Sequence, residues 1–385
     1  MVDRLLAHLD DNTSPITCLG GQNGSGKSRR LAELASELIE SGRRVIAVSN
    51  TVFDRFPRVR RANYMRLSPS IGRRYAAEVF KRALTSSPAE TLRNASLIGK
   101  ALEYTGFEPV IGLHVRLRAK ASLADLSRVL EGEMPRDDIP EVIRAFEIYK
   151  NYKNHRQSAW IDMYGGHIGP DRRELLGLLK HEFKLKRIGL VENVSITLER
   201  KNLIYELDEA SSGEISLLAT YAYIATHIQQ GDVVLIDEPE NSLHPRWQRE
   251  YCRRLLDQFY LYSPRFLIAT HSPNIVQGAQ SSDVNVRLVR MPSDEVTMEP
   301  ITKSIEGTLY EVFGVLSPAN HYLSEKVTYI LNELIQHRQD LDATRKELEG
   351  LRELSDDHEQ REFLGRAIEL AAEVKDKLES REGRQ

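Results

Sequence analysis

The sequence predicts an α/β fold in which a parallel sheet carries a phosphate-binding loop. Three observations lead to this prediction: short apolar runs alternate with helical segments, a glycine-rich loop follows the first run, and two adjacent acids follow a later one. Parallel strands need a crossover connection, usually a helix, so this alternation is typical of a parallel sheet. The 385 residues allow two or three folding units, or one large α/β domain with insertions.

The glycine-rich loop, residues 20–28, reads GGQNGSGKS and follows the apolar run 16–19. Leucine, alanine and isoleucine then recur at helical spacing, so the loop joins a strand to a helix. Backbone N–H groups and the positive end of the helix dipole surround a phosphate in such a loop. Lys27 would reach the β- and γ-phosphates, and the Ser28 hydroxyl would hold Mg²⁺. The predicted ATP-binding residues of the loop are Gly21, Asn23, Gly24, Ser25, Gly26, Lys27, Ser28 and Arg29.

A second motif, VVLIDEP at 233–239, is a buried strand that ends in two acids. In an enzyme with a phosphate loop, Asp237 would bind Mg²⁺ and Glu238 would orient or deprotonate the attacking water. His271 directly follows another short apolar strand, 266–270. Because parallel strands end at one edge of a sheet, we expect His271 to contact the γ-phosphate or the water there.

Composition is that of an ordinary globular protein, with 41% apolar and 28% charged residues. The net charge of −3 gives no overall attraction to nucleic acid or to a membrane. No apolar run is long enough to span a bilayer, and the first residues are too acidic for a signal peptide. Cys18 and Cys252 are interpreted as buried thiols in a reducing compartment, so we expect a cytoplasmic protein without a membrane partner.

The order of segments predicts an interrupted nucleotide-binding head, formed by residues 1–60 and 187–320. Residues 61–186 are mostly helical in pattern, with one β-like run at 110–117, and are predicted to be an inserted helical subdomain. Residues 321–385 are charged and poor in glycine, which predicts a helical hairpin or coiled-coil arm. A tail packed on its own domain is the alternative. Two further hairpins are expected, from 194–198 to 203–207 and from 283–290 to 295–299.

Four motifs in order, GQNGSGKS, SSGE, VVLIDEPENSLHP and IATHSP, resemble the Walker A, signature, Walker B and switch-histidine motifs of ABC-type ATPases. More closely, the chain resembles their soluble branch, which includes RecF/SMC-like, overcoming-lysogenization-defect and Septu-type antiphage defence ATPases. The resemblance covers residues 14–60 and 190–320.

The resemblance implies roles for individual residues. Lys27 and Ser28 would bind phosphate and Mg²⁺, Asp237 would be a metal ligand, Glu238 the catalytic base, and His271 the switch. Sites of this family are built at a head-to-tail dimer interface, so Ser211 and Gly213 would contact the γ-phosphate of the partner's ATP. Residues 240–244, ENSLH, occupy the place of the dimer-crossing loop.

Three departures from the family pattern stand out. Ser212 replaces the first glycine of the transporter signature. No metal-coordinating glutamine can be assigned, because Gln157 lacks a strand before it; Asn50 is a speculative substitute. No aromatic residue precedes the phosphate loop to stack on adenine. A second strand is predicted at 43–49. Asn50 and Asp54, in the loop after it, are candidates for positioning water or Mg²⁺, although solvated loop residues are the favoured interpretation.

These features predict an ATP-hydrolysing switch subunit in antiphage defence. It would form a homodimer or higher homo-oligomer and control a separate effector protein, a nuclease or toxin, with nucleic acid as a further candidate partner. The main alternative is a DNA repair or chromosome-maintenance ATPase of the RecF/Rad50 type, although a long coiled coil and a strong basic groove are missing from the sequence. A transporter subunit and a protein that binds ATP without appreciable turnover are further alternatives.

Overall fold

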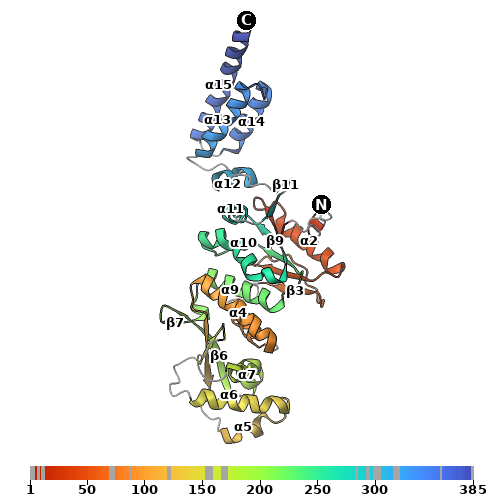
Figure 1. Cartoon of the computed structure of the whole chain (residues 1–385), viewed down its shortest axis with the longest axis vertical. Helices are drawn as coiled ribbons and strands as arrows, with labels where there is room; N and C mark the ends of the chain where they lie inside the picture. Colours follow the sequence, from red (N-terminus) through yellow and green to blue (C-terminus); the bar gives the residue numbers. More distant parts are fainter. Residues whose placement is uncertain are drawn as a thin grey trace.

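The computed structural model of the chain describes residues 5–6, 9, 14–68, 74–85, 88–118, 123–151, 159–165, 172–281, 285–291, 295–297, 305–314, 321–355 and 358–382. The molecule is elongated, and a head with a mainly parallel sheet forms its middle (Figure 1). A smaller antiparallel sheet with its helices lies on one side of the head, and a group of C-terminal helices on the other. The predicted α/β fold of the P-loop NTPase class is confirmed.

Seven strands form the sheet of the head, in the order β11-β10-β1-β9-β8-β2-β3. All neighbours run parallel except β11, which is antiparallel to β10. The four apolar runs predicted as buried strands are β1, β2, β8 and β9. The strands are β1 (Ile16–Gly20), β2 (Val45–Ser49), β3 (Tyr64–Leu67), β8 (Val233–Asp237), β9 (Arg265–Thr270), β10 (Val286–Arg290) and β11 (Glu295–Thr297).

Each central strand divides its side chains between two apolar cores, because successive residues of a strand point to opposite faces. On β8, Val233 and Leu235 join the core beneath α2 (Lys27–Glu40), and Val234 and Ile236 join the opposite core. That opposite core also contains residues of α9 (Ser212–His227), α10 (Pro245–Phe259) and α11 (Pro273–Gln280). Helices therefore cover both faces of the sheet and leave its carboxyl edge for the loops.

The second sheet has the order β5-β4-β6-β7 and is antiparallel. Its strands are β4 (Val110–Leu117), β5 (Ala159–Asp162), β6 (Val191–Arg200) and β7 (Leu203–Glu206). The predicted hairpin of β6 and β7 is confirmed, and Lys201 and Asn202 turn it with φ of 51° and 62°. Helices of this region are α3 (Arg74–Leu84), α4 (Pro88–Thr105), α5 (Leu123–Leu130), α6 (Ile139–Asn151), α7 (Arg172–Lys180) and α8 (Glu182–Arg187).

Strand pairing crosses both ends of the predicted insertion, 61–186. Strand β3 lies inside that range but pairs with β2 of the head sheet. Strand β4 also lies inside it and pairs with β6, which begins after residue 187. Near the end of this range, α7 and α8 are separated by a break at His181. Gln157 lies outside the described residues.

The C-terminal part contains α12 (Ile305–Phe313), α13 (His321–Ile335), α14 (Leu341–Leu354) and α15 (His358–Glu382). The last three pack around a small core of their own, so the predicted two-helix hairpin has three helices. The additional break follows α13, where His337 adopts a left-handed φ of 55°. Asp340 then starts α14, because its Oδ1 accepts a hydrogen bond of 2.7 Å from Ala343 N.

Cys18 and Cys252 are both buried free thiols, as expected. In the described part of the chain, no helix is both long enough and apolar enough to cross a bilayer.

Candidate active site

The phosphate loop lies between the end of β1 and the start of α2. Gly24 and Gly26 have φ of 83° and 94°, a left-handed conformation that glycine adopts without steric cost. Gly26 stands at the N-cap of α2, and no side chain of the described residues caps that end. The first N–H groups of this 14-residue helix are therefore available to an anion.

Lys27 and Ser25 carry polar groups that could donate hydrogen bonds to a phosphate. The Lys27 ammonium is folded back and donates to Gly21 O at 2.8 Å and Gln22 O at 2.9 Å. Burial lowers the pKa of Lys27, while the nearby acids Glu238, Glu240 and Asp237 oppose that shift. Ser25 Oγ is buried and has no hydrogen-bond partner among the described residues. These features fit a bound phosphate group.

Ser28 and Asp237 meet across 209 positions of the chain. Ser28 Oγ donates a hydrogen bond of 2.9 Å to Asp237 Oδ1. Asp237 is only 1% exposed, and burial raises the pKa of Asp237 to about 7. The charges of Glu238, Glu240 and Asp54 add to this rise, and the Ser28 hydrogen bond opposes it. A hydroxyl beside a buried carboxylate is the ligand pair that Mg²⁺ takes in P-loop enzymes, so these residues fit the ion.

Sheet register brings the motifs to one edge. Strand β9 lies between β1 and β8, with Thr270 opposite Gly20 and Ala269 opposite Asp237. The phosphate loop, His271 and the two acids therefore follow three adjacent parallel strands. This is the edge of an open α/β sheet where ligands bind.

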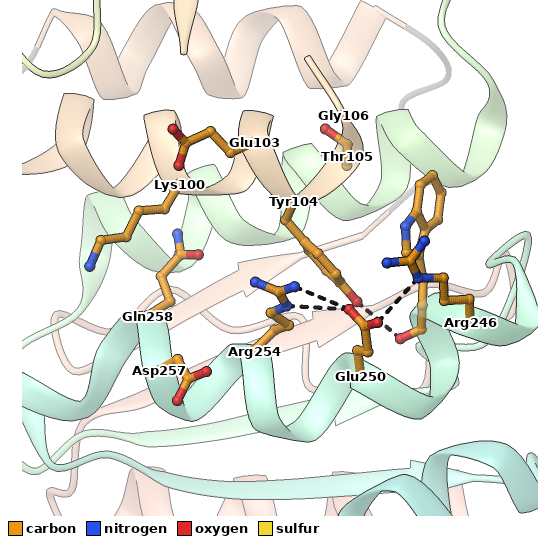
Figure 2. A pocket seen from close by; sticks show the side chains of 11 residues that line it. Lys100, Glu103, Tyr104, Thr105, Gly106, Arg246, Glu250, Arg254, Asp257 and Gln258 are labelled. Carbon is orange, nitrogen blue, oxygen red and sulfur yellow. Dashed lines mark hydrogen bonds and ion pairs between the residues drawn. The ribbon is translucent and has the colours of Figure 1, made fainter. Parts of the chain in front are cut away.

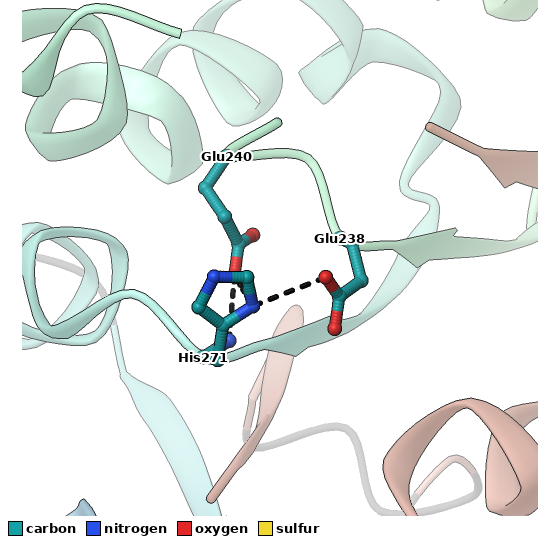
Figure 3. A group of neighbouring side chains, drawn as sticks. All are labelled: Glu238, Glu240 and His271. Atoms are coloured by element: carbon teal, nitrogen blue, oxygen red, sulfur yellow. Dashed lines mark hydrogen bonds and ion pairs between the residues drawn. The ribbon is translucent and has the colours of Figure 1, made fainter. Parts of the chain in front are cut away.

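Glu238, which directly follows Asp237, forms a cluster with Glu240 and His271, and Figure 3 shows these three side chains. His271 Nδ1 lies 3.0 Å from Glu238 Oε2 and 3.1 Å from Glu240 Oε1. Glu238 has a left-handed φ of 53°, which is strained for a residue with a side chain, and its N–H donates to Ala269 O at 2.9 Å. Strained backbone clusters at functional sites, so the conformation of Glu238 supports this sheet edge as the candidate site.

Glu240 is a residue of the cluster that sequence reasoning missed. It was predicted only as part of a dimer-crossing loop. Its Oε1 accepts hydrogen bonds from Thr270 Oγ1 at 2.7 Å and from His271 N at 2.6 Å. The side chain is buried, burial raises the pKa of Glu240, and Oε2 has no hydrogen-bond partner among the described residues. The two-residue spacing from Glu238 was the only available signal, and it does not show that the side chain turns back to β9.

Ser211 and Gly213 lie at the start of α9. Ser211 forms a capping box with Glu214: Glu214 N donates to Ser211 Oγ at 3.3 Å, and Ser211 N donates to Glu214 Oε2 at 2.8 Å. Ser211 is therefore the N-cap of α9. A Cβ on Gly213 would lie 2.3 Å from Ser242 O, so only glycine fits there. Within the described residues, no hydrogen bond or ion pair joins these two residues to their own phosphate loop.

The remaining predicted positions differ in their surroundings. Asn23 is exposed, and exposed Arg29 pairs with Glu33 at 3.1 Å. Asn50 lies against the second motif, because its N–H donates to Asp237 O at 3.0 Å. The interpretation of Asp54 as a solvated loop residue is wrong. Its side chain is 1% exposed and accepts a hydrogen bond from Arg66 Nε at 2.7 Å, because the loop folds back on β3.

A separate hollow of about 570 Å³ lies between α4 and α10 (Figure 2). Three of its charged side chains pair with each other: Glu250 contacts Arg246 and Arg254, each at 3.2 Å. Tyr104 closes one wall and donates to Trp247 O at 3.1 Å. None of the predicted nucleotide-binding residues lines it. The phosphate loop and its sheet edge therefore remain the candidate site.

The fold and this order of motifs define the chain as an ABC-type P-loop ATPase. It belongs to the family described as "AAA domain, putative AbiEii toxin, Type IV TA system", whose sequence profile matches residues 85–277. The matched range contains Asp237, Glu238 and His271 and begins after the phosphate loop.

Solved structures show weaker likeness. An ATP-binding cassette of an ABC transporter, in its ADP conformation, is 13% identical, with a TM-score of 0.30, and the match covers 78% of this chain and 84% of that one. VirB4 of Thermoanaerobacter pseudethanolicus is also 13% identical, with a TM-score of 0.27 and coverage of 72% and 77%. Such scores add nothing to the fold assignment. No curated protein matches the sequence.

Proposed function

We propose that the chain is an ATP-binding and ATP-hydrolysing switch subunit that dimerises head-to-tail around ATP and controls a separate effector protein in antiphage defence. The observation that carries the ATPase assignment is the 2.9 Å hydrogen bond from Ser28 to Asp237, with Glu238 as the next residue. Two motifs 209 positions apart meet there in the arrangement that metal-assisted phosphoryl transfer requires.

The side chains divide the work of hydrolysis. Lys27 would exchange its bonds to Gly21 and Gln22 for phosphate oxygens, and Ser28 and Asp237 would hold Mg²⁺. The ion would neutralise negative charge on the transferred phosphoryl group. A water attacks the γ-phosphorus, the bond to the bridging oxygen of ADP breaks, and Glu238 accepts the water proton. His271, 3.0 Å from Glu238, would orient this group and the water.

The test is the ATPase rate of Glu238→Gln. Loss of a general base costs about 10²–10⁴ in rate, so we expect turnover to fall at least 100-fold while ATP binding persists. Glu349→Gln is the matched control, because Glu349 is 51% exposed on α14. Equal rates for Glu238→Gln and wild type would refute the base assignment. Negligible turnover by wild type would favour a protein that only binds ATP.

The dimer would complete the site. Ser211 and Ser212 are exposed at the start of the 16-residue helix α9, and among the described residues no hydrogen bond or ion pair joins them to the phosphate loop of their own chain. An exposed, serine-rich helix N-terminus suits the γ-phosphate of a second chain's ATP. The resemblance to ABC-type ATPases supports the same arrangement.

The C-terminal helices are the proposed docking site for the effector. Gln22, in the phosphate loop, donates to Phe313 O of α12 at 2.6 Å. Glu311 of the same helix accepts a hydrogen bond of 2.8 Å from Tyr322 of α13. Two hydrogen bonds and one helix thus connect the phosphate loop to the arm. The family description names a toxin and a type IV TA system, which supports control of an effector, though the Septu-like identity rests on the motifs alone.

Deletion of residues 323–385 tests the docking proposal. The three helices have their own core, so the head should still bind ATP. We expect the truncated chain to lose co-purification with its effector. Retained co-purification would contradict the proposal.

A further inference from the structure

The loop between β2 and β3 carries an unpaired group of arginines. Arg55, Arg58, Arg60 and Arg61 lie within seven residues, and all four are exposed. In the part of the chain that the structure describes, none of them has an acidic partner. Phe53, at the start of the same loop, is 83% exposed. The chain as a whole has a net charge of −3, so this local positive charge is not a property of its composition.

Several exposed arginines elsewhere pair with an acid of their own helix. Arg253 pairs with Asp257 at 3.7 Å, Arg345 with Glu349 at 3.0 Å and Arg366 with Glu362 at 2.6 Å. These are ordinary i, i+4 pairs on a solvated surface. The arginines of the loop lack such neighbours, and its one acid, Asp54, is already occupied by Arg66. Their charge is therefore available to a ligand.

The base of the loop is fixed. Phe56 is 4% exposed in the core beneath α2, and its N–H donates to Asp54 Oδ1 at 2.8 Å. Asn63 closes the other end and donates to Arg43 O at 2.8 Å. A ligand would therefore meet a loop that is already ordered, which lowers the entropic cost of binding.

We propose that this loop, residues 52–62, binds single-stranded nucleic acid. Guanidinium groups match phosphate oxygens with paired hydrogen bonds, and all four basic residues of the loop are arginines. The loop also borders two shallow hollows: Arg60 and Arg61 line one of about 510 Å³, and Arg55 lines another of about 550 Å³. The exposed Phe53 ring provides a face on which an unpaired base stacks. An acidic protein would use the charges but not the ring.

The experiment measures binding of fluorescein-labelled oligothymidylate and oligouridylate, about 20 nucleotides long, to the full chain by anisotropy. For Arg58→Ala/Arg60→Ala/Arg61→Ala we expect at least a tenfold loss of affinity. The log–log salt slope should fall by about 2, since each phosphate contact on a single strand contributes about 0.7. Arg253→Ala/Arg345→Ala/Arg366→Ala changes the net charge equally and should bind within twofold of wild type.

Phe53→Ala separates nucleic acid from an acidic protein. We expect a loss of about tenfold with an unchanged salt slope, because stacking adds affinity without releasing ions. The proposal is overturned if wild type does not bind at low salt, if the two triple variants weaken equally, or if polyglutamate competes equally well and Phe53→Ala has no effect. The two labelled strands report whether DNA or RNA is preferred.

A consequence for hydrolysis rests on the proposed function. The loop begins beside Asn50, whose N–H donates to Asp237 O at 3.0 Å, so a bound strand should change the ATPase rate. The binding assay contains no ATP. Failure of the ATPase assignment would leave the binding result standing, and the reverse also holds.

Discussion

Asp237 is buried, and burial disfavours the charged form of its carboxyl group. Its pKa is raised to about 7 by burial, so the metal-free native state holds a proton that the unfolded chain releases near pH 4. Between these values the native state binds more protons than the unfolded state. Stability is therefore greatest below about pH 4 for this group and falls as pH rises toward 7. A rise of this size corresponds to at most about 4 kcal/mol.

Thermal melts without metal or nucleotide test this point. We expect wild type to lose Tm between pH 5 and pH 8 relative to Asp237→Asn, which carries no titrating group there. Mg²⁺ with ATP should restore the wild-type Tm at pH 8, because the ion compensates the buried charge. Parallel pH profiles for the two proteins would contradict the raised pKa.

Some site residues could be predicted because each lies at the end of a buried strand or in the loop after it. Lys27, Asp237, Glu238 and His271 occupy such positions, so their nearness follows from a parallel sheet. Their roles remain proposals. Glu240 could not be predicted, because its importance depends on a side chain that returns to the neighbouring strand.

At the scale of elements, α9 depends on a close backbone approach at Gly213. A Cβ there would meet Ser242 O at 2.3 Å, whereas one on Gly350 in α14 would meet nothing within 4 Å. We expect Gly213→Ala to lower the free energy of unfolding by about 1–3 kcal/mol through overpacking. Gly350→Ala should raise it by about 0.4–1 kcal/mol through its effect on the unfolded chain.

Urea unfolding of both variants measures the difference. Similar stability changes of the same sign would show that the contact between α9 and the loop after β8 is not tight. The same contact explains why Gly213 stays glycine although Ser212 replaces the first glycine of the signature.

Element boundaries were harder to predict than element types. Leu334, Leu341 and Leu348 recur every seven residues, a spacing typical of one continuous helix, yet α13 ends before Leu341. Leu334 and Leu348 still share the small C-terminal core, from two different helices. A periodic pattern records which residues are buried, and a sharp turn can keep that burial while it breaks the helix.

At the scale of the whole molecule, strand order was the main feature that the sequence did not define. Strands β1 and β2 are consecutive around α2, but β9 and β8 lie between them. Local patterns predict strands and their direction, and tertiary packing decides which strands are neighbours. Strand pairing also crosses both boundaries of the predicted insertion: β3 joins the head sheet, and β6 joins the second sheet. No change of composition along the chain indicates this.

The proposed switch also operates at this scale. ATP held by the phosphate loop of one chain would contact Ser211 of another and close the dimer. Helix α12, which contacts the phosphate loop, would transmit this change to the arm. The arm and the arginine loop lie in separate parts of the chain, so one molecule has room for an effector and for a nucleic-acid ligand. Separate variants of each surface distinguish the two interactions.

Light scattering of Glu238→Gln tests the central claim most directly. With ATP and Mg²⁺, this variant, which should bind ATP without hydrolysing it, should double its mass from the 43.9 kDa of one chain. With ADP it should return to the mass of one chain. The same mass with ATP as with ADP would contradict a site shared between two copies.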